Sequence, residues 1–135
     1  MSEIAPLLET VSPRFVLLLA MDATSIANDQ LRDLAHRLIG RGLAYLCAWG
    51  PDCKRVHDQF DFERDPNETD GRVVMTTWHD NEPLAETAWE FTNCAYPAEE
   101  FEADCTDWVA IAVDNADWER ELRDELVLKS EGFPP

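Results

Sequence analysis

Arg14-Phe-Val-Leu-Leu-Leu-Ala-Met-Asp22 is the segment that most strongly indicates how the chain folds. It contains an unbroken apolar run from Phe15 to Met21 and ends on a carboxylate. The run is too short to cross a bilayer, which needs about 20 apolar residues, and it lacks the alternation of a half-buried antiparallel strand. A continuous run of this length, followed by a helical pattern, is typical of a strand buried on both faces in a parallel sheet.

The rest of the chain alternates between helical and strand-like patterns. After Asp22, Thr24 and Ser25 can cap a helix whose apolar residues recur at three- and four-residue spacing until Gly40-Arg-Gly42 stops it. Three further strands are predicted at 43–49, 72–78 and 108–113, and three further helices at 51–64, 79–94 and 115–131. A short helical turn is expected in the acidic connection from Glu99 to Asp107.

Four strands alternating with four helices predict an α/β fold, a single three-layer domain with a four-stranded, mostly parallel sheet and helices on both faces. We expect a Rossmann-like or flavodoxin-like domain over residues 14–131, with an N-terminal arm at 1–13 and a tail at 132–135. The expected strand order is 2-1-3-4, and the residues expected to be almost fully buried are Leu17, Leu19, Leu46, Val74 and Ile111. In such a sheet a ligand binds outside the carboxyl ends, where the strand order reverses, here between the first and third strands.

The composition is strongly acidic. Twenty-eight acidic residues stand against eleven basic ones, which gives a formal net charge of −17 over 135 residues. Nucleic acid and membrane surfaces are not expected partners, because binding either depends on clusters of Lys and Arg. The charge fits a soluble or salt-adapted surface, or else an acidic face that binds a basic protein partner or mimics nucleic acid.

The N-terminus and the cysteines predict a cytoplasmic protein. Met1-Ser-Glu lacks the positive charge and apolar region of a secretory signal. The four cysteines, Cys47, Cys53, Cys94 and Cys105, form no CxxC pair and no zinc-like spacing. Cys47 and Cys105 fall in or beside predicted strands, where a reduced thiol behaves as a small hydrophobe.

Polar and aromatic residues gather where the predicted strands end. The residues expected to bind a ligand there are Asp22, Trp49, Asp52, Trp78, His79 and Asp80, with Thr24, Thr77, Glu82, Asp114 and Asn115 close by. Each acidic residue taken singly could do no more than complement a helix dipole. The concentration of two tryptophans, a histidine and several carboxylates at one edge favours a binding site.

Several common chemistries are excluded at this edge. No glycine-rich loop follows the first strand, so a dinucleotide cofactor is not expected. Asp22-Ala-Thr24 lacks the second acid of an Asp-x-Asp phosphotransferase, and no lysine stands on a late strand as a response regulator requires.

Cys53 and His57 are candidates for nucleophilic chemistry, with His79 as a third candidate catalytic residue. The pair lies one turn apart on a predicted helix, where the helix dipole would lower the pKa of the thiol. Cys53 also belongs to the apolar stripe of Val56 and Phe60, and a core cysteine is the preferred interpretation.

A divalent metal is the second possibility. Asp22, His79 and Asp80 are the candidate ligands, because imidazole and carboxylates suit divalent ions, and His57 and Asp52 could lie nearby. None of these residues shows a diagnostic ligand spacing. We expect nearby carboxylates to favour the protonated form of His79 unless a metal displaces the proton.

Several motifs resemble an uncharacterised family of small acidic bacterial proteins described only as a domain of unknown function. They are Ala48-Trp-Gly-Pro-Asp-Cys53 with Val56-His-Asp58, Val74-Met-Thr-Thr-Trp-His-Asp80 with Glu82-Pro-Leu84, and Cys94-Ala-Tyr-Pro97. The likeness covers most of residues 14–118. It implies membership of the family and no particular activity.

Two hypotheses of function follow. The first is a site at the carboxyl edge for a small polar ligand or a metal, where the two tryptophans would suit a cationic or neutral ligand better than a phosphate. The second is a non-catalytic interaction protein, of the immunity or regulatory kind, whose acidic surface binds a basic partner. Neither hypothesis specifies a reaction or an oligomeric state.

Overall fold

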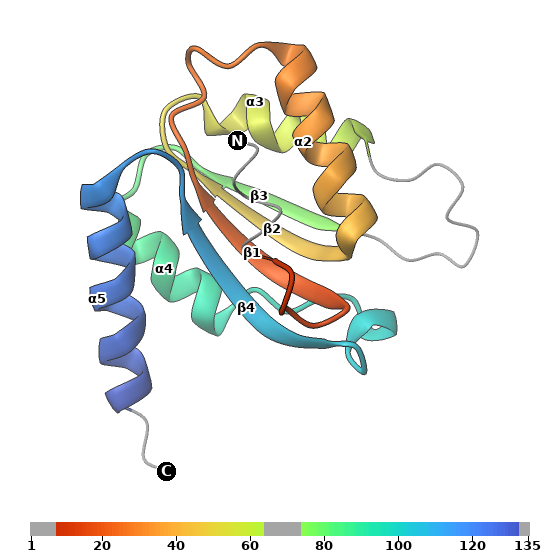
Figure 1. Ribbon diagram of the computed structural model, residues 1–135. Helices are drawn as coiled ribbons and strands as arrows, with labels where there is room; N and C mark the ends of the chain where they lie inside the picture. The colour runs from red at the N-terminus through yellow and green to blue at the C-terminus, as the bar shows by residue number, and fades with distance from the viewer. Residues whose placement is uncertain (1–7, 64–73, 133–135) are drawn as a thin grey trace.

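The computed structural model describes residues 8–63 and 74–132 (Figure 1). In chain order the elements are β1 (Arg14–Ala20), α2 (Asn28–Arg41), β2 (Leu43–Trp49), α3 (Cys53–Glu63), β3 (Met75–His79), α4 (Leu84–Asn93), the 3₁₀ turn η1 (Glu99–Phe101), β4 (Cys105–Ala112) and α5 (Ala116–Gly132). The predicted polar loop at 65–71, the first two residues of the predicted third strand, and the ends of the arm and tail lie outside the described residues.

The α/β fold predicted from the sequence is confirmed. Every strand pairing is parallel, and β1 lies between β2 and β4. Helices α2 and α3 cover one face of the sheet, and α4 and α5 lie on the other (Figure 1). None of the helices in the described part of the chain has the length and apolar character needed to cross a bilayer.

The unbroken apolar run of β1 reflects burial on both faces. Leu17 and Leu19 belong to the core under α2 and α3. Val16 and Leu18 belong to the second core, under α4 and α5. Because neither face of this strand meets water, neither face carries polar side chains.

The predicted strand order is corrected from 2-1-3-4 to 3-2-1-4. β2 is buried along most of its length, whereas β3 contains Thr76 and Thr77 and is exposed or half-buried until His79. The more apolar β2 therefore takes the second interior position, and the more polar β3 lies at the edge beside it. Consequently the strand order reverses between β1 and β4, and not between β1 and β3 as predicted.

Some predicted boundaries also shift. β3 extends one residue further than predicted and so includes His79, and β4 begins earlier, at Cys105. Helix α2 begins at Asn28, where the side chain of Gln30 accepts a hydrogen bond from the Ala27 amide, so Thr24 and Ser25 are not its N-cap. Val74, which was expected in the core, is only partly buried.

Candidate functional site

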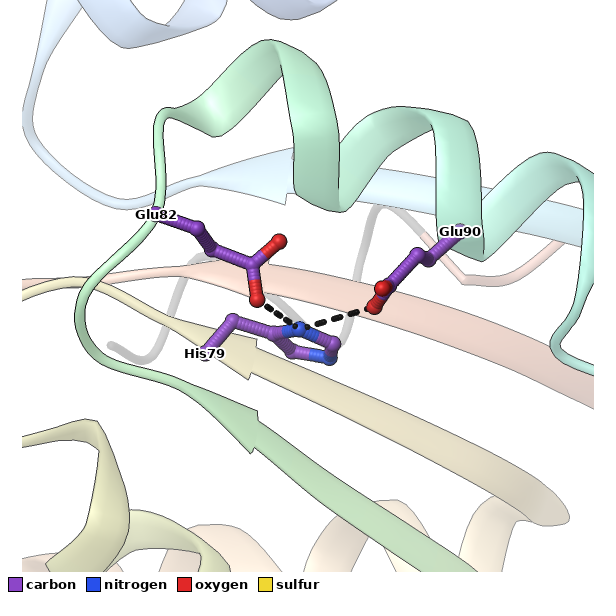
Figure 2. A group of neighbouring side chains, drawn as sticks. All are labelled: His79, Glu82 and Glu90. Atoms are coloured by element: carbon purple, nitrogen blue, oxygen red, sulfur yellow. Dashed lines mark hydrogen bonds and ion pairs between the residues drawn. The ribbon is translucent and has the colours of Figure 1, made fainter.

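The site centres on the imidazole of His79, which meets two glutamates (Figure 2). Nδ1 of His79 lies 2.7 Å from Oε1 of Glu82 and 3.1 Å from Oε2 of Glu90. One ligand atom from each residue lies within 4.8 Å of the others. The His79 side chain is only 8% exposed, against 21% for Glu82 and 41% for Glu90, so the cluster reaches from the edge of the core to solvent.

Three neighbouring segments bring these side chains together. Successive residues of a strand point to opposite faces, and His79, at the end of β3, points towards α4 (Figure 2). Glu82 lies in the loop between β3 and α4, and Glu90 descends from α4 onto the imidazole (Figure 2). The indole Nε1 of Trp49 donates to the backbone carbonyl of Glu82 at 2.9 Å, which fixes this loop to the end of β2.

The second ring nitrogen of His79 faces Thr77. Nε2 lies 2.9 Å from the Thr77 hydroxyl. The same hydroxyl donates a hydrogen bond to the backbone carbonyl of Leu46 at 3.4 Å. Residues 77 and 79 share a strand face, so this contact follows from the two-residue period of β3. The contact orients the ring and leaves Nδ1 as the nitrogen that faces the carboxylates.

Thr77 also joins the site to a buried thiol. In the β2–β3 register Thr77 is opposite Cys47. Burial raises the pKa of the Cys47 thiol to about 11, while a hydrogen bond with Thr77 acts in the opposite direction and the carboxylates of Glu90 and Glu82 raise it further. Cys47 is therefore a protonated thiol at neutral pH, which is not the nucleophilic form.

Two buried oxygens near the site have no hydrogen-bond partner. Among the described residues, the buried side-chain atoms without a partner are Oε2 of Glu82 and Oγ1 of Thr87. Thr87 is fully buried on α4, three residues before Glu90 and so on a neighbouring part of the same helix face. An unpaired buried oxygen costs roughly 1–3 kcal/mol, so a bound cation that contacts Oε2 of Glu82 would remove a cost already present.

The predicted ligands Asp22 and Asp80 lie apart from this cluster. Asp22 follows β1, which β2 separates from β3. Its carboxylate accepts hydrogen bonds from the hydroxyl and the amide of Thr24, and these lower the pKa of Asp22. Asp80 directly follows His79 but is exposed, and the candidate metal-binding group contains Glu82 and Glu90 in its place.

Trp49 and Trp78, which were both expected to bind the ligand, lie on opposite faces of the sheet. Trp49 packs edge-on against Trp118 of α5, with ring centroids 5.0 Å apart. Trp78 faces α3, where its ring centroid lies 4.5 Å from that of His57 and Lys54 lies over the indole. The two indoles therefore do not line one common cavity.

Asp52 has a local role in the turn after β2. It has a positive φ of 64°, and its carboxylate lies 2.8 Å from Nε of Arg55. The guanidinium of Arg55 also donates to Asn28 and to the carbonyls of Ala23 and Ile26. Arg55 therefore holds the loop between β1 and α2 onto the start of α3, and Asp52 supports that contact.

The proposed nucleophile Cys53 is part of the core. Its side chain belongs to the cluster under α2 and α3, and burial raises the pKa of its thiol, the reverse of the effect expected from the helix dipole. His57 is engaged elsewhere, with Nδ1 2.9 Å from a carboxylate oxygen of Asp58. The structure therefore agrees with the interpretation of Cys53 as a core cysteine.

Glu90 was not among the residues predicted from the sequence, and Glu82 was expected only as a neighbour of the site. In the sequence Glu90 lies in the middle of α4, well separated from any strand end, and it adjoins the apolar stripe of Leu84, Ala88 and Phe91. One feature of the sequence could have pointed to Glu90: two polar residues, Thr87 and Glu90, lie on a helix face that should pack against the sheet.

The donor set suits a divalent ion. One imidazole nitrogen and two carboxylates can bind a first-row divalent metal, with remaining positions open to water or a ligand. When Nδ1 carries a proton, the same geometry lets it donate to either glutamate and so links β3 to α4. The contact between Nε2 and the Thr77 hydroxyl holds the second ring nitrogen, as outer contacts do for a metal-binding histidine.

The fold and the site define a small three-layer α/β protein with a candidate cation site at the carboxyl end of an edge strand. A family model described as Domain of unknown function (DUF7684) matches residues 2–128. The chain belongs to this family, as the sequence motifs indicated. A search of curated proteins and a search of solved structures each gave no match.

Proposed function

We propose that the protein binds a divalent metal ion at the site formed by His79, Glu82 and Glu90. One observation carries the proposal: a buried imidazole nitrogen lies 2.7 Å and 3.1 Å from two carboxylates. A metal in place of the proton on Nδ1 would keep all three side chains as ligands with small movements. The partial exposure of Glu90 gives the ion a path from solvent.

Electrostatics also support a cation at this position. The protein carries a net charge of −17, and Glu82 and Glu90 bring two formal negative charges to a site at the edge of the core. A divalent ion would neutralise these charges and would provide a partner for Oε2 of Glu82.

Thermal unfolding in the presence of metals tests the proposal. The purified chain is treated with a chelator, then titrated with Zn²⁺, Mn²⁺, Co²⁺, Mg²⁺ or Ca²⁺. A ligand at 100 times its Kd stabilises the native state by about 2.7 kcal/mol, which corresponds to roughly 5–10 °C in Tm for a chain of this size. We expect at least one ion to produce a shift of this size.

A matched pair of variants assigns the shift to the site. Glu90→Gln removes one ligand charge, whereas Glu86→Gln removes the same charge from an exposed position one turn earlier on α4. We expect Glu90→Gln to abolish the shift and Glu86→Gln to retain it. Equal shifts in both variants, or no shift with any ion in the parent, would contradict the proposal.

The second candidate function is that of an acidic interaction protein with a basic protein partner. The net charge of −17 supports it. In the part of the chain that the structure describes, Arg37, Lys54, Arg120 and Arg123 each pair with an acid three or four residues away on the same helix. A basic partner that binds parent and Glu90→Gln equally, with no metal effect on either, would favour this function.

Two finer descriptions accompany the proposal. The order 3-2-1-4 matches the first four strands of the Rossmann arrangement, which supports the description of the domain as Rossmann-like. A cytoplasmic location is supported by the cysteines, since all four are free thiols. Recovery of the native protein from the soluble cytoplasmic fraction of its host cells is the expected result.

A further inference from the structure

We infer that the site selects a first-row transition ion over Mg²⁺ and Ca²⁺, and that Thr77 is the positioning residue that makes this selection possible. The inference rests on the proposed metal-binding function and names the class of ion. It follows from the identity of the ligand atoms and from the contact on the far side of the imidazole.

The first step concerns the ligand atoms. Ca²⁺ prefers six to eight oxygen ligands, and Mg²⁺ prefers octahedral oxygen with several retained waters. The central atom of this site is a nitrogen, Nδ1 of His79, with one oxygen of Glu82 and one of Glu90 as its neighbours. Imidazole suits Zn²⁺, Co²⁺ and other first-row ions, which also accept four ligands, so the donor set favours them.

The second step concerns which ring nitrogen binds. Nε2 lies 2.9 Å from the Thr77 hydroxyl, on the side of the ring away from the carboxylates. Thr77 is only partly exposed, and its hydroxyl can donate to the Leu46 carbonyl while it accepts from Nε2–H. An imidazole that donates through Nε2 has its lone pair on Nδ1, the atom that faces Glu82 and Glu90.

The third step concerns rotation of the ring. His79 is buried beneath α4, and its second nitrogen is held from β3 itself, two residues away. Loss of the Thr77 hydroxyl leaves Nε2 without this partner and frees the ring to turn. The outer contacts of metal-binding histidines typically contribute 10–100-fold in affinity. We therefore expect Thr77 to contribute on this scale to the affinity for an ion that binds through the imidazole nitrogen. It should contribute very little to the affinity for an ion that binds through oxygen atoms.

The test is titration with Co²⁺, monitored by its visible absorption, followed by competition. Binding of one Co²⁺ per chain should give an absorption spectrum that Zn²⁺ abolishes at stoichiometric amounts and that a thousandfold excess of Mg²⁺ or Ca²⁺ leaves unchanged. Thr77→Val keeps the shape of the side chain without the hydroxyl and should weaken Co²⁺ binding 10–100-fold. Thr77→Ser restores the hydroxyl and should restore affinity, while Asp80→Asn, at an exposed neighbouring position, should match the parent.

The outcomes separate the two claims. If no divalent ion binds the parent, the proposed function fails and this inference fails with it. If Mg²⁺ or Ca²⁺ displaces Co²⁺ at comparable concentration, metal binding stands and the selectivity is refuted. If Thr77→Val binds Co²⁺ as tightly as the parent and with an unchanged spectrum, the positioning role of Thr77 is refuted.

Discussion

Gly50 allows the backbone after β2 to approach the backbone of Met21 at the carboxyl edge of the sheet. Replacement of Gly50 by alanine tests whether this close approach requires glycine. Gly50 follows β2 with φ of 118°, a conformation that L side chains rarely adopt. A Cβ at this position would lie 2.4 Å from the carbonyl oxygen of Met21, at a separation that real Cβ atoms essentially never show. Because that oxygen belongs to the backbone, it cannot rotate away.

The cost of Gly50→Ala can be worked from these contacts. Strain from a non-glycine residue in this conformation is about 1–3 kcal/mol. Moving the backbone at Gly50 away from Met21 also weakens the hydrogen bond that the Met21 amide donates to the Trp49 carbonyl at 3.0 Å. Such a hydrogen bond contributes about 0.5–1.5 kcal/mol. We expect a total loss of about 2–4 kcal/mol in the free energy of unfolding.

Urea unfolding, followed by circular dichroism, measures this loss. With a slope of about 2 kcal/mol per molar urea, in the middle of the usual range for small proteins, the midpoint should fall by roughly 1–2 M. Gly40→Ala is the matched control, because Gly40 lies in α2 and a Cβ there would meet no neighbouring side chain or packed element within 4 Å. Alanine is also the better helix former, so this variant should gain about 0.5–1 kcal/mol. A Gly50→Ala midpoint equal to that of the parent, or equal losses in both variants, would show that the close approach of Gly50 to Met21 does not require glycine.

Three further predictions follow from the core, the charge and the cysteines. Leu17→Ala should lower the free energy of unfolding by roughly 2–5 kcal/mol in urea titrations, because Leu17 is fully buried in the central strand; a loss under about 1 kcal/mol would contradict this. Tm should rise between low salt and about 0.1 M salt, where the Debye length is about 10 Å, because the net charge of −17 repels itself; a fall would show that the acids are locally balanced. Burial raises the pKa of Cys47 to about 11 in the folded state, above the value of about 8.5 in the unfolded chain. The protonated thiol therefore contributes about 3 kcal/mol to stability below about pH 8.5, and this contribution is lost as pH rises from about 8.5 to about 11. Cys47→Ala should therefore lose less stability than the parent over that interval, and parallel profiles would contradict the raised pKa.

The fold could be predicted because the sequence of β1 alone indicates that this strand is buried on both faces. An apolar run from Phe15 to Met21 with no alternation has few solutions other than a strand buried on both faces, and helical periodicity between the strands then implies helices on both sides. The same reasoning explains why the core residues Leu17, Leu19, Leu46 and Ile111 were predicted correctly.

The strand order was predicted incorrectly because it depends on a comparison between strands. The second interior position of the sheet, next to β1, could be taken by the second or the third strand as far as connection lengths allow. The difference in polarity between Leu43–Trp49 and Met75–His79 carries the information, since the threonines of the latter are more easily accommodated at an edge. The order is therefore encoded in the relative polarity of two strands and not in any single segment.

The composition of the candidate site could be predicted only in part. His79 was placed at the carboxyl edge from its position after a strand, and this required only local information. Glu90 joins it because α4 packs over β2 at a height that places Glu90 beside His79, and periodicity does not determine this height. Asp22 stays apart because β2 lies between its strand and β3, a direct consequence of the order that was not predicted.

The most direct test of the metal site is anomalous X-ray diffraction from crystals of the protein grown with Zn²⁺, with data collected on both sides of the zinc absorption edge. We expect one edge-dependent peak within bonding distance of Nδ1 of His79, about 2.0–2.1 Å, and of a carboxylate oxygen from each of Glu82 and Glu90. An ordered His79–Glu82–Glu90 cluster with no peak between its three ligand atoms would contradict it.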